Sequence, residues 1–294
     1  MTLPLEVFSD SSERLHYNIP DFPMYVHKDQ LVRYGYAATC HWHPDLEFIL
    51  VFDGEMDFFV NGEIVHIDSN NGIFVNSKRM HYGFSADKGN CSFIAVVIHP
   101  ALLFENSQDM KQYLNQKFGE GSDDFILLHP NIDWQQEASH LISGIYEDMH
   151  SGSSNLIRLL SKAVSLCANM ADHVQQVSKH HVYEEFREIV LKMTGFIHQY
   201  YDTKITLGDI ASSGAVCRSK CCELFNEYIG QTPNAYVIRY RIAKSCDMLR
   251  ETNRTVSDIA ITCGFQSASY FSYVFRNETG LTPKEYRKQI TLSL

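Results

Sequence analysis

The feature that most constrains this chain is an internal repeat in its last third. The segment TLGDIA at Thr206–Ala211 returns as TVSDIA at Thr255–Ala260. The segment GQTPNAY at Gly230–Tyr236 returns as GLTPKEY at Gly280–Tyr286. Two copies of one sequence pattern predict two copies of one structural unit.

Each copy reads as two short helices joined by a tight turn. A threonine that can cap a helix, Thr206 or Thr255, opens each copy, with Asp three residues later. Gly214 or Gly264 then supplies a turn, where we expect a positive φ. A second helix follows and ends at a Gly-x-x-Pro segment. This order predicts helix-turn-helix units. The expected bounds are 203–230 and 253–280 for the two units and 234–250 for the helix that joins them.

The charge is spread unevenly, and this bears on the partner of the repeat. The chain has a formal net charge of −10, and the excess of acidic residues lies before Tyr183. An acidic protein is repelled by nucleic acid unless its basic groups lie on one face. The outward faces of the repeat carry Arg218, Lys220, Arg276 and Lys284. We therefore favour DNA binding over a helical solenoid, for which two repeats are few.

The second copy carries a family resemblance. Thr255–Arg276 and Gly280–Arg287 resemble the signature of AraC/XylS-type transcription regulators. The resemblance implies two units in successive major grooves of double-stranded operator DNA, activation of transcription, and RNA polymerase as a partner. By position, it implies that the bases are read by Ser219, Cys222, Glu223, Ala268, Ser269, Ser272 and Tyr273.

Two residues of the first unit depart from that family pattern. Cys217 replaces the usual Ser at the start of the first recognition helix, so that helix should begin less firmly. Glu223 stands where the family often has Arg. A carboxylate is repelled by a phosphate, but it can accept a hydrogen bond from N4 of cytosine. The two units should therefore read their half-sites by different chemistry.

The N-terminal half has the pattern of an antiparallel β-domain. Short apolar runs are separated by Asp-Gly and Asn-Gly pairs, which favour hairpin turns. A small sandwich or barrel is the expected fold. The runs are 46–52, 56–60, 64–67, 73–75 and 93–98.

Histidines and a glutamate in this half resemble the first motif of the cupin family, a jelly-roll barrel. Gly35, His41, His43, Glu47 and Gly54 carry the resemblance, with His81 as the further histidine. The resemblance leaves three interpretations: a small-molecule pocket, a divalent transition-metal site, and a purely structural cluster. The pocket would be lined by His41, Trp42, His43, Glu47, His81 and Tyr82, and the metal would be held by His41, His43, Glu47 and His81.

We expect the pocket, with a sugar or related carbon source as effector and no metal or other cofactor. Asn76 and Lys78 replace the usual Pro and Gly of the second cupin motif, and sensor domains of AraC-type proteins often hold no metal. Trp42 and Tyr82 could stack on a sugar face, although aromatic residues at such positions often belong to the core.

Helical periodicity follows the β-domain. A second apolar stripe in this segment has the spacing of a coiled-coil seam, and related proteins commonly dimerise through such helices. The alternative is packing against the barrel of the same chain. The seam residues are Leu156, Leu160, Ala163, Cys167, Met170 and Val174.

These patterns together predict a multi-domain α+β protein. Its parts are a cupin-like sensing domain with an N-terminal arm over 1–130, a helical dimerisation segment over 131–178, a linker over 179–183 and an AraC-type DNA-binding domain over 184–294. The first residues lack a basic and apolar secretory signal, and apolar runs are strand-sized, so we expect a cytoplasmic protein without membrane contact.

The predicted function is that of a ligand-responsive, homodimeric transcription regulator rather than an enzyme. One alternative is a metal-dependent cupin enzyme with an accessory DNA-binding domain. Another is a regulator that senses redox state through Cys217, Cys221 and Cys222, which cluster on one expected helix.

Overall fold

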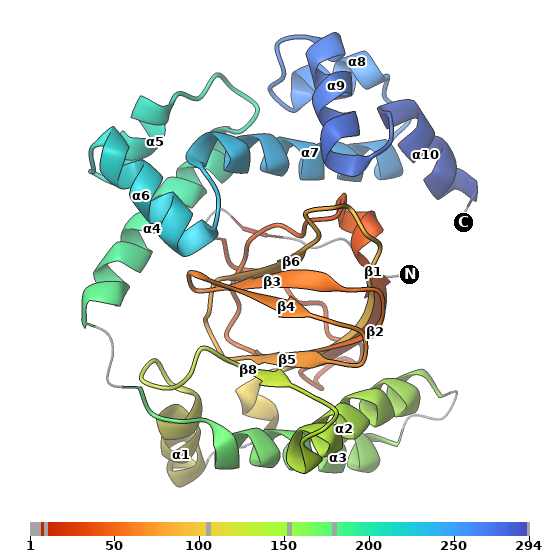
Figure 1. The fold of residues 1–294 in the computed structure, drawn as a ribbon, viewed down its shortest axis with the longest axis vertical. Coiled ribbons are helices and arrows are strands. Elements are labelled where there is room, and N and C mark those ends of the chain that lie inside the picture. Colours follow the sequence, from red (N-terminus) through yellow and green to blue (C-terminus); the bar gives the residue numbers. More distant parts are fainter. Residues whose placement is uncertain (1–6, 9–10, 104–106, 152–154, 178–180, 293–294) are drawn as a thin grey trace.

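A β-barrel forms the middle of the molecule, with helices on two sides (Figure 1). The computed structural model describes residues 7–8, 11–103, 107–151, 155–177 and 181–292. The helices α1 to α3 lie along one side of the barrel, and α4 to α10 arch over the other (Figure 1). This is the fold class that the sequence predicted.

Two antiparallel sheets build the barrel. The larger sheet has the strand order β1-β7-β2-β5-β8, and the smaller has the order β4-β3-β6. The strands of the larger sheet are β1 (Met24–Gln30), β2 (Leu46–Asp53), β5 (Gly72–Val75), β7 (Ser92–Ile98) and β8 (Phe125–Leu128). Those of the smaller are β3 (Met56–Val60), β4 (Glu63–Ile67) and β6 (His81–Phe84). Short 3-10 helices lie at Leu31–Tyr34 and Pro100–Leu103.

The larger sheet is buried on both faces, which explains its uninterrupted apolar runs. Alternate residues of β7, such as Phe93 and Ala95, pack inside the barrel with Ile49 of β2. The residues between them, such as Ile94 and Val96, pack against the helices. The five apolar runs recognised in the sequence all lie in strands. The strands β1, β6 and β8 were not assigned from the sequence.

Three helices cover the outer face of this sheet. They are α1 (Gln108–Phe118), α2 (Asp133–His150) and α3 (Leu156–His173). The break that the sequence predicts between α2 and α3 lies largely outside the described residues. One core cluster joins these helices to the strands, so they belong to the same domain as the barrel.

The expected coiled-coil seam on α3 is wrong in four of its six residues. Ala163, Cys167 and Met170 are buried in the core of the domain, and so is Val174 at the end of the helix. The intrachain alternative prevails for them because α2 and the sheet bury the same stripe. Leu156 and Leu160 are exposed, together with Ile157 and Val164.

In the described residues 181–292, seven helices form the C-terminal part. They are α4 (His181–Tyr200), α5 (Leu207–Ser213), α6 (Arg218–Ile229), α7 (Pro233–Glu251), α8 (Val256–Thr262), α9 (Ala268–Thr279) and α10 (Pro283–Leu292). The helix pairs α5–α6 and α8–α9 lie within the ranges 203–230 and 253–280 expected for the two units, and α7 lies between the pairs. The linker expected over 179–183 is wrong from His181 on, because α4 begins there; residues 179 and 180 lie outside the described residues.

The caps of the two units differ as the sequence predicts. Thr206 and Asp209 form a reciprocal capping box at α5, and Ser267 accepts a hydrogen bond from the Tyr270 N–H at α9. Cys217 makes no such side-chain bond at α6. The expected positive φ occurs at Gly264 but not at Gly214, since Ala215 takes the left-handed conformation in the first turn.

Gly214 has a different reason for being small. A Cβ at Gly214 would lie 2.7 Å from Cγ of Met193, on the helix that packs against this turn.

Among the described helices, none is long and apolar enough to cross a membrane.

Candidate functional site

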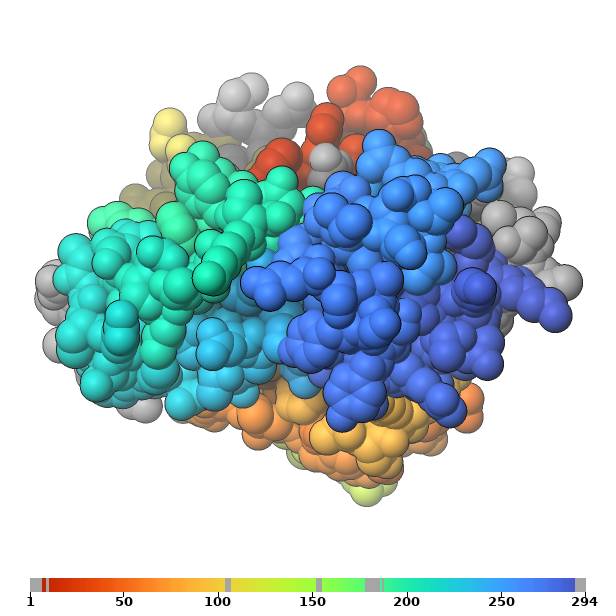
Figure 2. All heavy atoms as spheres, turned by 90° about the horizontal axis from the view of Figure 1, so that it is seen from above, coloured from red at the N-terminus to blue at the C-terminus, as the bar shows by residue number. Residues whose placement is uncertain are grey.

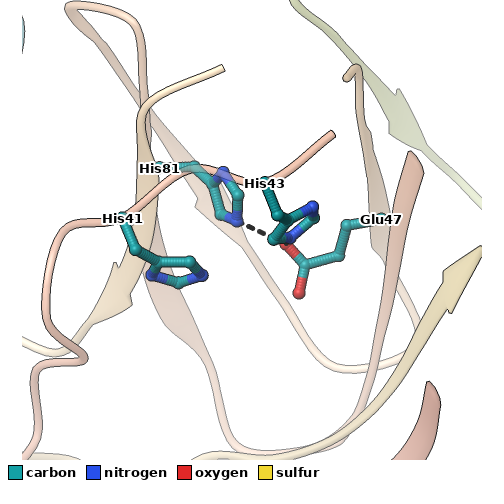
Figure 3. A group of neighbouring side chains, drawn as sticks. All are labelled: His41, His43, Glu47 and His81. Atoms are coloured by element: carbon teal, nitrogen blue, oxygen red, sulfur yellow. Dashed lines mark ion pairs between the residues drawn. The ribbon is translucent and has the colours of Figure 1, made fainter. Parts of the chain in front are cut away.

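The predicted histidine and glutamate cluster forms inside the barrel. His41 and His43 precede β2, Glu47 lies in β2, and His81 opens β6. His41 and His81 pair through their backbones, with N–H to carbonyl distances of 3.1 and 2.9 Å. Figure 3 shows the three imidazoles and the carboxylate turned toward a common space. The structure therefore brings together the four residues that the sequence singled out.

Each imidazole of the cluster is held by a backbone carbonyl. The Nδ1 atoms of His41 and His81 lie 2.8 Å from the carbonyl oxygens of Thr39 and Arg79. The Nδ1 atom of His43 lies 3.2 Å from the carbonyl oxygen of Asp45. A carbonyl oxygen can only accept, so each Nδ1 carries a proton. In the neutral rings, Nε2 therefore presents a lone pair.

The Nε2 atoms converge on Glu47. His81 Nε2 lies 2.7 Å and His43 Nε2 lies 3.7 Å from Oε2 of Glu47. These three buried atoms nevertheless have no hydrogen-bond partner of good geometry. Unpaired buried polar atoms are costly, so a positive charge on one of the imidazoles would stabilise the Glu47 carboxylate.

The electrostatics of the cluster place that positive charge on His43 rather than on His41. Burial alone would raise the pKa of Glu47, but His81 and His43 hold it well below its usual range. Burial disfavours a charged His43, yet the contacts with Glu47 and the charge of Glu13 outweigh burial and raise its pKa to about 9. Burial, with His81 and His43 as neighbours, lowers the pKa of His41 to about 3.

The N-terminal arm supplies a second carboxylate. Oε2 of Glu13 lies 3.5 Å from His41 Nε2 and 3.9 Å from His43 Nε2. Burial raises the pKa of Glu13 to about 8. The arm is fastened to the barrel by backbone hydrogen bonds between Glu13, Ser11 and Trp42. Sequence patterns gave no signal for Glu13, because the contact depends on how the arm folds back.

A cavity of about 70 Å³ adjoins the cluster. One water needs roughly 10–15 Å³ of such space, so the cavity has room for a handful of waters. Its walls combine arm residues with aromatic and apolar side chains of both sheets. They include Glu13, Arg14, Leu15, His16, Tyr25, His27, Tyr34, His41, Glu47, Phe58, His81, Tyr82 and Phe93.

The structure separates the predicted ligand residues into three groups. His41, Glu47, His81 and Tyr82 line the cavity, and His43 completes the cluster behind them. The expected place of Trp42 in the pocket is wrong, since its side chain packs into the cluster between the barrel and the first helix-turn-helix unit. Its neighbours His41 and His43 point the other way, as alternation in extended backbone requires.

Strand β1 contributes two pocket residues that sequence reasoning missed. Tyr25 and His27 stack with their ring centroids 4.7 Å apart on β1. Both line the cavity, and burial lowers the pKa of His27. Their spacing of two residues was a signal for one strand face, but nothing in the sequence related that face to His41.

The predicted DNA-binding residues lie on the two recognition helices, α6 and α9. In the space-filling view the two units form the left and right parts of one face (Figure 2). Tyr273 is 66% exposed, and Ser269 and Arg276 are also exposed. Ala268 and Ser272 are half-buried. The second unit thus presents an aromatic ring and a cation to a partner.

The first recognition helix presents a different surface. Arg218, Ser219 and Glu223 are exposed, whereas Lys220 and Cys222 are half-buried. Nζ of Lys220 lies 2.7 Å from Oε1 of Glu223, so the two charges pair with each other. Cys221 of α6 is buried, and burial raises the pKa of its thiol to about 11. Cys217, which directly precedes α6, is exposed.

The barrel contacts both helix-turn-helix units. The hydroxyl of Tyr82 donates to the carbonyl oxygen of Ile229, at the end of α6, over 3.0 Å. On the other unit, Lys88 donates to the carbonyl of Asn277. The arm also takes part, since the Ser11 hydroxyl donates to Oγ1 of Thr194 in α4 over 2.9 Å.

Comparisons with known proteins agree with this division of the chain. A family model described as an AraC-like ligand binding domain matches residues 23–163, and one described as a helix-turn-helix domain matches residues 210–289. The chain is 27% identical over 260 residues to the HTH-type transcriptional regulator YdeC of Bacillus subtilis (strain 168), covering 86% of this chain and 87% of that one.

Further similarities span most of the chain. The melibiose operon regulatory protein of Escherichia coli (strain K12) is 27% identical over 259 residues, covering 85% of this chain and 83% of that protein. The crystal structure of ToxT from Vibrio cholerae O395 has a TM-score of 0.45 and 15% identity, over 91% of this chain and 97% of that chain. With a ligand-binding model on the barrel and a helix-turn-helix model on the repeat, the chain belongs to the AraC family of transcription regulators.

Proposed function

We propose that this regulator responds to a small effector that enters the barrel cavity and alters how the DNA-binding units are held. The observation that carries this proposal is the position of the arm. Residues Glu13 to His16 line the cavity, while Ser11 bonds to Thr194 of α4. One short segment therefore touches both the effector pocket and the DNA-binding domain.

The size of the cavity gives the coupling a physical basis. A space of about 70 Å³ is too small for a sugar, so an effector of that size displaces part of the wall. The arm is one of the wall segments that lie outside both sheets, and it also contacts α4. Its displacement would change the bonds that Ser11 and Phe8 make to α4. A ligand shifts such an equilibrium only if it binds the two arrangements with different affinity.

A sugar is the proposed effector class. Aromatic rings at Tyr25, Tyr34, Phe58 and Phe93 offer faces for a sugar ring, and the histidine cluster offers polar groups at one end. The named role of the melibiose operon regulatory protein supports this choice. We propose that the barrel binds the effector without transforming it, that the protein acts in the cytoplasm, and that operator-bound protein activates transcription with RNA polymerase.

The proposed operator contacts use both recognition helices. Ser269, Ser272 and Tyr273 would read bases from α9 and Ser219, Cys222 and Glu223 from α6, while Arg276 and Arg218 would contact phosphates. The proposed homodimer forms through the exposed face of α3 rather than through the buried seam.

A thermal-shift series on the full chain tests the effector proposal. Melibiose and a panel of monosaccharides would be added at increasing concentration, and at least one should raise the unfolding midpoint. Tyr25→Ala should abolish that shift by removing a wall of the cavity. Tyr113→Ala, an exposed ring on α1 of the same domain, is the matched control and should keep it. A panel that shifts no midpoint, or equal shifts in both variants, contradicts the proposal.

The enzyme alternative has its own test. A metal-dependent cupin enzyme would convert the compound that shifts the midpoint, whereas a sensor returns it unchanged. Incubation of metal-loaded protein with that compound, followed by mass spectrometry, distinguishes the two.

A further inference from the structure

The side chain of Arg241 extends from the middle of α7, the helix that joins the two helix-turn-helix units (Figure 1). Its Nε donates to the carbonyl oxygen of Tyr201 over 2.7 Å, and its Nη2 donates to that of Thr203 over 2.7 Å. Both carbonyls lie between the end of α4 and the start of α5. A guanidinium carries its N–H donors in a fixed plane, so it can hold two carbonyls of one loop at once. Arg241 therefore fixes the segment that leads into the first unit.

The same guanidinium lies against the second unit. Cζ of Arg241 is 5.8 Å from the centroid of the Phe265 ring, which is within the range of a cation–π contact. Phe265 is buried in the turn between α8 and α9 and belongs to the apolar core of the second unit. Arg241 thus contacts the loop before one unit and the turn inside the other.

The backbones of the two units also approach each other closely beside Arg241. A Cβ at Gly264, in the turn of the second unit, would lie 2.4 Å from the carbonyl oxygen of Tyr201 and 3.0 Å from Nη2 of Arg241. Gly264 also has a φ of 80°, which residues with a side chain rarely adopt. The turn therefore needs glycine both for its conformation and for the space that the first unit occupies.

The sequence repeat shows that this contact is particular to the second unit. Gly214 occupies the equivalent position of the first unit, where a Cβ would meet the apolar side chains of Met193 and Ile189 on α4. At Gly264 the corresponding space is filled by a backbone carbonyl and a guanidinium. The same position of the repeat therefore packs on an apolar helix face in one copy and on the loop of the neighbouring unit in the other.

The apolar cores of the two units are separate. Among the described residues, the buried core of the first unit includes Tyr236 and Val237 from the start of α7, and that of the second includes Ile242 and Cys246 from farther along the helix. Within that part of the chain, the two cores share no buried residue. Apart from the barrel, the units are therefore held together by α7 and by the contacts beside it. Arg241 makes such contacts at the boundary between the cores.

An arginine that only satisfied the carbonyl groups after α4 would stabilise that helix end and leave the relative position of the units unchanged. The contact with Phe265 and the close approach at Gly264 go beyond that local role. We propose that Arg241 is a positioning residue for DNA binding, which fixes the first helix-turn-helix unit against the second. The consequence for DNA, one accepted distance between the two blocks of an operator, rests on the proposed function. The contact between the units does not.

A distance measurement on the full-length chain tests the positioning directly. Ser212 on α5 and Ile261 on α8 are exposed and occupy equivalent positions of the repeat. Each would be replaced by a ketone-bearing amino acid that carries a nitroxide, because the chain has eight cysteines that a thiol label would also modify. Pulsed electron paramagnetic resonance then gives the distribution of distances between the labels without DNA. We expect a narrow distribution with Arg241 present and a broader or displaced one in Arg241→Ala.

Two further variants separate positioning from general destabilisation. Arg241→Lys keeps the charge but loses the planar fork that holds two carbonyls, so its distribution should be intermediate. Lys244→Ala removes another half-buried cation of α7, whose Nζ lies 5.4 Å from the centroid of the Tyr240 ring on the same helix. This control should keep the wild-type distribution. Circular dichroism and the unfolding midpoint show whether each variant is folded at the temperature of the measurement.

DNA binding by the unlabelled protein gives the functional readout. Duplexes selected from random sequence by the wild-type chain would be remade with one base pair inserted between the two blocks. The insertion misplaces the contacts of one unit, so wild-type affinity should fall by at least the roughly tenfold that one mismatched base pair costs. Arg241→Ala should bind the unaltered duplex more weakly and lose less affinity on insertion. A variant that was merely less stable would keep the wild-type ratio of the two affinities.

The outcomes separate the contact between the units from the proposed function. An unchanged distribution of label distances in folded Arg241→Ala overturns the proposal. An unchanged ratio of the two duplex affinities overturns the role of Arg241 in DNA binding, even where the label distances differ. A wild-type chain that selects no two-block duplex contradicts the proposed function, and the label distances then still decide whether Arg241 holds the two units together.

Discussion

At the scale of single residues, the two helix-turn-helix units differ most where their recognition helices begin. Ser267 accepts from the Tyr270 N–H, whereas Cys217 leaves the corresponding N–H groups of α6 without a side-chain acceptor. A good N-cap typically stabilises a helix by about 1 kcal/mol. The first turn of the second recognition helix is therefore more stable than the first turn of the other recognition helix.

Exchanging the caps tests this difference. Ser267→Ala should speed amide hydrogen exchange in the first turn of α9 about fivefold, as expected for a loss of about 1 kcal/mol. Cys217→Ser should slow exchange in α6 by a similar factor, because serine supplies the missing acceptor. Peptides from the barrel serve as the internal control. Equal exchange in wild type and Ser267→Ala would show that the cap contributes nothing.

Tyr273 and Arg276 should play different roles on DNA. Tyr273→Ala should relax sequence choice, because the exposed ring would face base edges. Arg276→Ala should weaken binding to all sequences and lower the salt slope by about 0.9, as loss of one phosphate contact does. Fluorescence anisotropy with matched and mutated duplexes at several salt concentrations measures both. Identical effects of the two substitutions on DNA binding would contradict the proposed groove contacts.

The spacing of residues in the sequence indicated which side chains form the histidine and glutamate cluster, but not which residues surround it. His41 and His43 face the same side because alternate residues of extended backbone do, and the sequence reveals that. The same rule sends Trp42 to the opposite side, into the interdomain cluster. Glu13 could not be predicted, because its position depends on a contact between the arm and the barrel that no local pattern encodes.

At the scale of elements, α3 presents an apolar face to solvent. Ile157 is 81% exposed, and Leu156, Leu160 and Val164 lie on the same side of the helix. Side chains of this kind on one helix face are typical of a protein interface. We propose that a second copy of the chain covers it, in keeping with the symmetric contacts of most homo-oligomers.

A charge on that face should prevent dimerisation. Ile157→Glu combined with Leu160→Glu should give monomers by light scattering after gel filtration, since two carboxylates would be buried without partners. Ser165→Glu, exposed on another side of the same helix, is the control and should leave the dimer intact. Wild-type protein that is already monomeric at micromolar concentration would rule out this interface.

Helical periodicity in the sequence predicted a helix at α3, but it did not show which apolar residues of that helix are exposed to solvent. Leu156 and Leu160 share a seam spacing with Ala163 and Cys167, yet the first two are exposed and the others buried. The difference arises from α2 and the sheet, which cover only part of the stripe. Strands β6 and β8 escaped prediction because four residues are too few to show a period, and no Asn-Gly or Asp-Gly pair marks their start as Asn71-Gly72 marks that of β5.

At the scale of the whole molecule, the barrel holds both DNA-binding units. Tyr82 bonds to Ile229 at the end of α6, and the Tyr286 hydroxyl of α10 donates to the carbonyl oxygen of Arg33 over 3.3 Å. Phe59 and Tyr82 of the barrel share one apolar cluster with Phe225 of the first unit. The spacing of the two recognition helices is thus set partly by contacts with the sensor domain.

Removing one hydroxyl should loosen this contact. Tyr82→Phe deletes the bond to Ile229 and retains the ring, at a net cost of about 1 kcal/mol. Hydrogen exchange at the C-terminal end of α6 should therefore increase several-fold. Tyr113→Phe, on the exposed face of α1, should change nothing there. Unchanged exchange in Tyr82→Phe would mean that this bond does not hold the first unit to the barrel.

We propose that the two unlike helix-turn-helix units of this protein read one operator. The most direct measurement is selection of binding sites from random DNA duplexes by the full chain. We predict two enriched blocks about one helical turn, roughly 10 base pairs, apart. Tyr273→Ala should reduce the sequence enrichment only in the block that α9 reads. Selection that enriches no sequence, or a single block that Tyr273→Ala leaves unchanged, would contradict the account.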